Sequence, residues 1–322
     1  MRRLTLTIVG ATMFGIDFCG SAAAVADVLQ SVARRSRWLA PLFAFIEPFA
    51  VGYRKLFPHG PSLFFRREWA ELERVIAPII RERRGAASKD MLSLLLSERD
   101  EEGGRLTDED TKNEIVTFVL AGHETTATAL TWTWYLLAGH PRVEERLHAE
   151  VDSVLGDRAP MLEDLPRLSY TNMVFQESLR LYPPALAFAR RTKHNLELGG
   201  YHIVRGTSIF LSPYVTHRNP RYFEAPEEFR PERWETKPSA QFAYFPFGGG
   251  AKMCIGEPFA KLEAVLALAT LARQWKLENT NNGPVAIKQG LLLNPDQPIL
   301  MRAKRRGPEN TQIYVEHVTA AS

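Results

Sequence analysis

Hydrophobic positions recur at helical spacing through most of the chain, and alternating positions are rare. Apolar residues three and four positions apart predict helices over residues 1–17, 20–38, 66–84, 89–98, 107–138, 141–155 and 169–181, and a further helix after residue 256. Alternating patterns predict strands only within residues 185–212 and 273–301. The pattern therefore predicts a mainly α protein with small β-sheets.

The helix predicted over residues 107–138 differs from the others in its length and in lacking a polar face. Thr107 is a favourable N-cap, acidic residues 108–110 follow it, and Gly139 and Pro141 end the pattern. About 32 residues at ~1.5 Å each make a rod of roughly 48 Å. Since apolar and small residues surround its middle, we expect this helix to lie inside the fold.

The middle of this helix contains the sequence A-G-H-E-T-T at residues 121–126. Polar groups are costly inside a protein unless they are hydrogen bonded, and threonine hydroxyls can bond back to helix carbonyls. A zinc site of the form His-Glu-x-x-His is excluded, because Ala127 stands where the second histidine would be. From the residues alone, a helix with satisfied polar side chains remains an alternative to a functional site.

A second unusual segment, residues 245–256, reads F-P-F-G-G-G-A-K-M-C-I-G and contains Cys254. Its three glycines permit positive φ and close approach of the backbone to a bulky group. Backbone N–H groups in such a loop, and the N-terminus of the helix that follows, stabilise a thiolate, which is the metal-binding form. The glycine spacing fits neither a P-loop nor a dinucleotide-binding fingerprint. A lone cysteine is more often a small buried side chain, but that reading does not explain the surrounding pattern.

Composition and charge exclude several functional classes. The 322 residues include 40 Lys and Arg against 37 Asp and Glu, so we expect no nucleic-acid partner. Two cysteines, Cys254 and a structural Cys19, make a disulfide framework improbable and fit a reducing, cytoplasmic compartment. No apolar run reaches the ~18 residues of a transmembrane helix. Arg2 and Arg3 precede a run that polar residues interrupt, which favours a helix inside a domain over a signal peptide.

The cysteine segment matches the pattern F-x-x-G-x-x-x-C-x-G, with Phe247, Gly250, Cys254 and Gly256 at the fixed positions. At this point the sequence resembles the cytochrome P450 family of haem-thiolate monooxygenases. The resemblance implies that Cys254 is the axial iron ligand of haem b, iron protoporphyrin IX, and that its thiolate favours O–O cleavage.

Other cofactor contacts follow from the same resemblance. Gly248 would lie in the cysteine loop beside the haem. Arg190 and Lys252 are candidates to bind the haem propionates, and the alternative for each is a solvated surface cation.

The helix motif at residues 121–126 resembles the family's oxygen-binding motif, A/G-G-x-D/E-T-T/S. The resemblance implies that Thr125 hydrogen-bonds dioxygen at the haem and that Glu124 relays protons. It also implies that Ala121 and Gly122 leave room between the helix and the haem.

Two further segments resemble family motifs: Glu177-x-x-Arg180 matches E-x-x-R, and residues 231–234 (P-E-R-W) match P-E-R-F/W. An exposed Glu–Arg pair would contribute only a few tenths of a kcal/mol. The resemblance instead implies that Glu177, Arg180 and Arg233 form a buried, charge-assisted network that holds the cysteine loop.

The resemblance covers residues 1–303 as a single domain, and we expect residues 304–322 to be a disordered tail. Family members are longer at the N-terminus. The expected fold is therefore the cytochrome P450 fold lacking its N-terminal helices and part of the larger sheet. The aromatic segment at residues 41–61 is expected either to line an apolar substrate pocket or to pack on the core.

The implied reaction inserts one atom of O2 into an apolar small molecule. Its electrons would come from a separate donor, a ferredoxin, a flavodoxin or an NADPH-dependent reductase, because no reductase domain follows residue 303. The alternative is a truncated, catalytically inactive haem-binding protein, which the N-terminal difference favours and the intact Glu124–Thr125 pair opposes.

Overall fold

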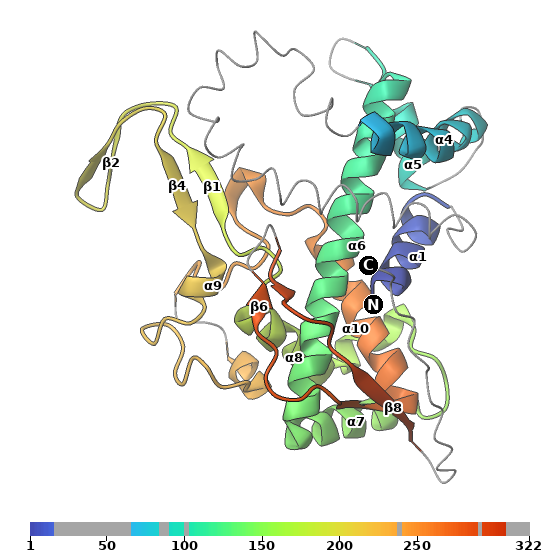
Figure 1. The fold of residues 1–322 in the computed structure, drawn as a ribbon, viewed down its shortest axis with the longest axis vertical. Coiled ribbons are helices and arrows are strands. Elements are labelled where there is room, and N and C mark those ends of the chain that lie inside the picture. Colours follow the sequence, from blue (N-terminus) through green and yellow to red (C-terminus); the bar gives the residue numbers. More distant parts are fainter. Residues whose placement is uncertain (16–65, 84–89, 100–102, 237–239, 289–291, 307–322) are drawn as a thin grey trace. The chain divides into compact units, whose positions relative to one another are not determined.

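The computed structural model describes residues 1–15, 66–83, 90–99, 103–236, 240–288 and 292–306 (Figure 1). The chain forms two compact units, residues 1–127 and 128–322. The predicted helix at residues 20–38, the aromatic segment at 41–61 and Cys19 lie outside the described residues. The prediction of a single domain stays a prediction.

The described residues of the first unit form three helices and the start of a longer one. They are α1 (Arg2–Met13), α4 (Arg66–Arg83), α5 (Met91–Ser97) and α6 (Asp108–Gly139). Helices α4 and α5 pack on each other, and the Asp90 carboxylate caps α5 by accepting a bond from the Ser93 N–H (2.8 Å). All four were predicted from the apolar periodicity.

The long helix α6 has 32 residues, the predicted length. Its N-terminus is capped reciprocally: the Asp110 N–H donates to Thr107 Oγ1 (3.1 Å), and the Thr107 N–H donates to the Asp110 carboxylate (3.2 Å). The hydroxyl and N–H of Thr107 hold the pKa of Asp110 below its usual value. From residue 126 to residue 130 every side chain of α6 is buried, as the absence of a polar face indicated.

The second unit is organised around α7 (Pro141–Leu155), α8 (Ser169–Leu181) and α10 (Glu257–Gln274), which pack on one another in pairs (Figure 1). The short η3 helix (Leu162–Arg167) lies against α7 and α10. The C-terminal part of α6 joins this core, since Thr133 donates to Ser178 of α8 (2.9 Å) and Trp132 stacks on Tyr182. The bounds of α7 and α8 are those predicted.

Among the described residues of the second unit, strands pair in four small antiparallel sheets. They pair β1 (Phe188–Arg191) with β4 (Ser208–Leu211), β2 (Leu196–Leu198) with β3 (Tyr201–Ile203), β5 (Trp275–Asn279) with β8 (Met301–Arg305), and β6 (Ile287–Lys288) with β7 (Asn294–Pro295). The β2–β3 hairpin turns at Gly199 and Gly200, whose φ angles of 59° and 82° suit a tight two-residue turn. Strand β8 continues to Arg305, two residues past the predicted end of the domain at residue 303, so the first two residues of the predicted disordered tail belong to a strand.

Three short helical segments connect these elements and place residues of the site: α9 (Pro213–Thr216), η4 (Pro231–Glu235) and η5 (Gly250–Lys252). Within the part of the chain that the structure describes, no helix combines the length and hydrophobicity that crossing a membrane requires.

Candidate functional site

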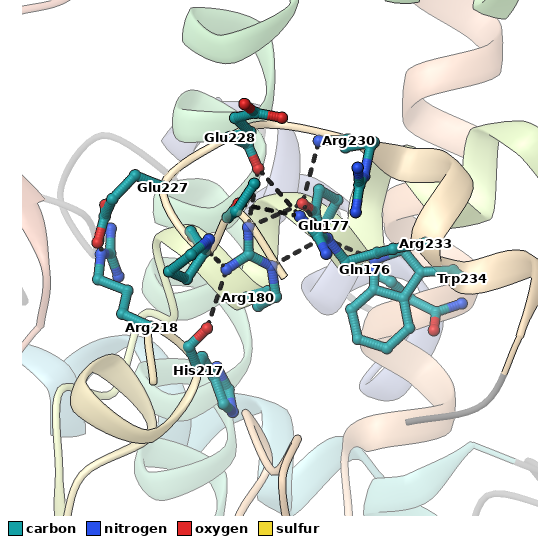
Figure 2. Close-up of polar contacts among 12 residues, drawn as sticks. Gln176, Glu177, Arg180, His217, Arg218, Glu227, Glu228, Arg230, Arg233 and Trp234 are labelled. Carbon is teal, nitrogen blue, oxygen red and sulfur yellow. Dashed lines mark hydrogen bonds and ion pairs between the residues drawn. The ribbon is translucent and has the colours of Figure 1, made fainter. Parts of the chain in front are cut away.

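Glu177 and Arg180 form the buried ion pair that the E-x-x-R motif predicts. Both side chains lie on α8 and are completely buried, with 0% exposure each. Arg180 Nε and Nη2 donate to the two oxygens of Glu177 at 2.9 and 2.8 Å (Figure 2). A planar guanidinium can pair with a carboxylate in this two-bond fashion, whereas an ammonium cannot.

The remaining donors of Arg180 reach backbone carbonyls of the segment that follows α9. Nη1 donates to the carbonyls of His217 (2.9 Å) and Pro226 (2.6 Å), and Nη2 donates to that of Glu228 (2.9 Å). All five N–H groups of the guanidinium thus have acceptors, which compensates the cost of burying the charge. The pair therefore attaches α8 to residues some forty positions later.

The η4 segment contributes three more donors to Glu177. Arg233 Nε donates to it at 2.8 Å, Trp234 Nε1 at 2.9 Å and the backbone N–H of Arg230 at 3.1 Å. The predicted partnership of Glu177, Arg180 and Arg233 is therefore present, and Figure 2 shows the three side chains converging. Trp234 was not predicted as a donor, although its place beside Arg233 in the motif is a signal that could have indicated it.

The cysteine loop, residues 245–256, folds back on itself through backbone hydrogen bonds. The Cys254 N–H donates to the Phe247 carbonyl (2.9 Å), and the Gly248 N–H donates to the Phe245 carbonyl (3.0 Å). Gly248 and Gly250 have φ of 76° and 70°, the left-handed region that glycine adopts without strain. The motif's glycines are therefore explained in part by the turns of the loop itself.

Cys254 lies at the end of this loop, three residues before α10 begins. Its side chain is exposed and is not part of a disulfide, and Ile255 beside it is 79% exposed. Gly256 leaves space near the sulfur, since a Cβ at this position would lie 3.7 Å from Sγ. A cysteine that is exposed and not part of a disulfide can ligate a metal, and the exposed Ile255 offers an apolar contact to a group bound there.

A hollow of about 540 Å³ opens beside the loop. Gln176 of α8, Trp234 and Phe242 form part of its wall, together with Phe247 to Gly250 of the loop. Glu257 and Lys261, an ion pair of 2.6 Å on the first turns of α10, line another part. Met253 also lines this hollow, and Cys254 does not.

The helix motif lies in the first unit. Thr125 donates its hydroxyl to the Ala121 carbonyl (2.5 Å), and Glu124 pairs with Arg2 of α1 at 3.5 Å. Gly122 lies against α1, because a Cβ at this position would be 3.3 Å from a methyl group of Val9. The structure thus supplies a neighbour for Gly122 that the sequence did not indicate, while its expected role beside the haem stays a prediction.

His123 of the same motif has a structural role. It is buried, its Nδ1 lies 2.8 Å from the Val119 carbonyl, and its own carbonyl accepts a bond from Thr5 (2.8 Å). Burial lowers the pKa of His123, so the ring is neutral at physiological pH.

The two predicted propionate ligands are exposed in the second unit. Arg190 lies on β1 and donates to the carbonyl of Ala189, and Lys252 is the last residue of η5 in the cysteine loop. Exposed cations on β1 and in the loop remain available to bind an anionic group. Among the described residues no cluster of three or more His, Cys, Asp or Glu side chains could hold a metal ion.

Comparison with known proteins decides the family. The cytochrome P450 family model matches residues 1–302. The chain belongs to the cytochrome P450 family. Its mainly α structure with small antiparallel sheets agrees with the P450 fold class that the sequence motifs predicted.

Several P450 relatives are similar to the chain. Cyclooctatin synthase of Streptomyces melanosporofaciens is 48% identical over 58% of this chain and 42% of its own length. Cytochrome P450 4V2 of Mus musculus is 42% identical over 68% of this chain and 43% of its own length. Cyclooctat-9-en-7-ol 5-monooxygenase of S. melanosporofaciens is 43% identical over 70% and 51%. The chain thus spans about half the length of the curated relatives it matches.

P450 proteins use a haem, and the cysteine loop fits this group. Its single thiol is exposed, is not part of a disulfide and lies three residues ahead of α10, so it can ligate a metal. The loop glycines and exposed Ile255 leave an apolar surface next to the sulfur. The arrangement of the α6 motif against this loop stays a prediction.

Proposed function

We propose that the chain forms the haem-binding and oxygen-activating part of a P450 monooxygenase that inserts one atom of O2 into an apolar small molecule. The observation that supports this most strongly is the exposed Cys254 in a loop of the family pattern, within the same unit as a fully satisfied Glu177–Arg180–Arg233 network. Removing charged groups from water costs free energy, so a buried network of this kind is expected where the local geometry must be maintained.

The residues near the thiol would hold haem b. Cys254 would ligate its iron, Gly248 and Gly250 would let the loop backbone pass close to it, and Arg190 and Lys252 would bind its carboxylates. When bound, the haem supplies the activation of O2, and thiolate ligation favours cleavage of the O–O bond. The protein contributes ligation, orientation and proton supply.

Proton supply would fall to the α6 motif. Thr125 holds a proton on its hydroxyl, which in this structure is donated to the Ala121 carbonyl, so the side chain must release that bond to donate elsewhere. Glu124, with a side chain 20% exposed, can exchange protons with water and resupply the hydroxyl. Phe247 and Gly256 would complete the contact of the loop with the haem, and Ala121 would leave space on the helix side.

The electrons would come from a separate ferredoxin, flavodoxin or NADPH-dependent reductase. An apolar substrate fits the family, and one similar protein is named cyclooctat-9-en-7-ol 5-monooxygenase. The alternative, a haem-binding protein without turnover, is distinguished by assaying product formation.

The test is to add haem to the purified chain and record the absorbance of its reduced, carbon monoxide-bound form. A strongly red-shifted Soret band that disappears in Cys254→Ala supports thiolate ligation. Failure to take up haem, or a band typical of a neutral thiol or histidine ligand, contradicts the proposal. Product formation with a surrogate reductase then separates the monooxygenase from the inactive alternative.

A further inference from the structure

His217 connects the buried ion-pair network to the cysteine loop, although no sequence motif singled it out. It follows α9 directly and is completely buried. Its two polar sides bind different parts of the unit: the backbone carbonyl meets Arg180, and the imidazole meets Phe245, the first residue of the cysteine loop.

The backbone side attaches His217 to α8. Arg180 Nη1 donates to its carbonyl at 2.9 Å, as Figure 2 shows. This bond belongs to the set that satisfies the guanidinium, so the position of the His217 backbone is determined by the Glu177–Arg180 pair.

The imidazole side attaches His217 to the loop. The backbone N–H of Phe245 donates to Nε2 of the ring at 2.9 Å. A nitrogen that accepts this bond carries no proton, so the ring is neutral with its proton on Nδ1. Burial lowers the pKa of His217 to about 3, which keeps the ring in this accepting form at physiological pH.

Aromatic rings enclose the imidazole and leave it little freedom to turn. Tyr244 lies with its ring centroid 5.0 Å away, and the Phe245 ring meets it edge-on at 5.5 Å. Tyr244 is separately attached to α8, because its hydroxyl donates to the Gln176 carbonyl at 3.0 Å. The segment that enters the cysteine loop is thus held at two adjacent residues.

Phe245, which binds His217, also takes part in the hydrogen bonds of the cysteine loop. The Phe245 carbonyl accepts the Gly248 N–H, which forms the first turn, and two residues after Phe245 the Phe247 carbonyl accepts the N–H of Cys254. Because the N–H of Phe245 binds His217 and its carbonyl closes this turn, a displacement of Phe245 alters the turn that leads to the backbone around the sulfur.

We propose that His217 is a positioning residue for the thiolate ligand: its Nε2 fixes the Phe245 peptide and through it the cysteine loop. The proposal rests on the proposed ligation of haem by Cys254. It assigns to His217 no contact with substrate or cofactor.

Two substitutions of the imidazole separate its hydrogen bond from its bulk. His217→Gln places an amide oxygen as far from the backbone as Nε2 and can accept the Phe245 N–H. His217→Asn places its amide closer to the backbone, where it cannot reach. Both retain the backbone carbonyl that Arg180 binds, so the ion-pair network is preserved in each.

The experiment records the spectrum of the reduced, carbon monoxide-bound form of the wild type and both variants at equal haem content. We expect the wild type and His217→Gln to show the red-shifted thiolate band. In His217→Asn this band should convert to the neutral-thiol band on the order of tenfold faster than in His217→Gln. Equal spectra and conversion rates for the two variants overturn the proposal. A wild type without the thiolate band instead contradicts the proposed function.

Amide hydrogen exchange of the haem-free chain provides a second measurement that does not depend on the cofactor. In His217→Asn, peptides covering residues 244–248 should exchange on the order of tenfold faster than in His217→Gln, while peptides of α7 remain unchanged. Exchange that is equally fast in both variants, or faster throughout the unit, shows that His217 acts only in general packing and overturns the proposal.

Discussion

Arg180 donates from Nε and Nη2 to the two carboxylate oxygens of Glu177, one turn earlier on α8, and neither side chain is exposed to solvent. An ion pair this deep is stabilising only if the remaining donors also find acceptors. Here three backbone carbonyls take them. The pair therefore depends on the fold of residues 217–228 as much as that segment depends on the pair.

The first prediction concerns Arg180→Lys. An ammonium has three donors and cannot match five acceptors, so the variant leaves Glu177 with fewer donors and several carbonyls of residues 217–228 buried without partners. We expect the free energy of unfolding to fall by about 3–5 kcal/mol. Urea unfolding followed by circular dichroism measures the change.

Arg230→Lys is the matched control for this prediction. Only the backbone N–H of Arg230 binds Glu177, while its side chain pairs with the exposed Glu224 at 3.0 Å. We expect a loss of less than about 1 kcal/mol. Losses of similar size in the two variants would show that the buried network contributes no more than a surface pair.

The second prediction tests the contact between α6 and α1. Gly122→Ala adds a methyl group 3.3 Å from Val9, so crowding of about 1–3 kcal/mol should outweigh the gain of ~0.5–1 kcal/mol that alanine brings to a helix. In the Val9→Ala background the same substitution should become stabilising. Gly139→Ala, on the same helix with no atom within 4 Å of the added methyl, should not destabilise. If Gly122→Ala changes the free energy of unfolding by the same amount in the wild-type and Val9→Ala backgrounds, the contact between Gly122 and Val9 is contradicted.

The third prediction tests the proton supply. Thr125→Val keeps the shape of the side chain and removes its hydroxyl. We expect haem binding to persist and product formed per electron supplied to fall roughly 10²-fold, the order of a general acid–base contribution. Thr117→Val is the control, since Thr117 is exposed on the same helix and makes the same type of bond, to the Asn113 carbonyl (2.8 Å). Equal yields from both variants would remove Thr125 from the mechanism.

Local signals made the helix bounds and the ion-pair network predictable. Thr107, Pro141 and the glycine pair at 199–200 act on their own turns, so their effects can be recognised from neighbouring residues. The E-x-x-R spacing places Glu177 and Arg180 on one helix face for the same reason.

Long-range neighbours were not predictable. His217 meets Phe245 across 28 positions and Arg180 across 37, and Gly122 meets Val9 across two separate helices. No periodicity or cap encodes such pairs, because they depend on how elements pack. The three-dimensional structure was needed to assign these residues a partner.

The last prediction concerns pH. Glu263 of α10 is 3% exposed, and neither of its carboxylate oxygens has a hydrogen-bond partner among the described residues. Burial raises its pKa from 4.5 to about 8. The folded state therefore holds a proton that the unfolded state releases, and this contribution to stability is complete below pH 4.5 and declines as pH rises toward 8.

Two buried histidines change the free energy of unfolding in the opposite direction and over a lower pH range. Burial lowers the pKa of His217 from 6.5 to about 3 and that of His148 to about 4. Their contributions are complete above pH 6.5 and are lost as pH falls below it. Between pH 6.5 and 8, of these three groups Glu263 alone changes the stability. We therefore expect the free energy of unfolding to decrease by up to about 2 kcal/mol over this range.

Glu263→Gln tests this assignment. The amide has the same shape but does not ionise, so the decline in stability between pH 6.5 and 8 should be lost. Urea unfolding at both ends of the range measures the difference. Glu145→Gln, at an exposed position of α7, should keep the wild-type decline. If Glu263→Gln keeps the same decline, another group is responsible and Glu263 is ionised in the folded protein, which would require that water reaches its carboxylate between α10 and its neighbouring helices.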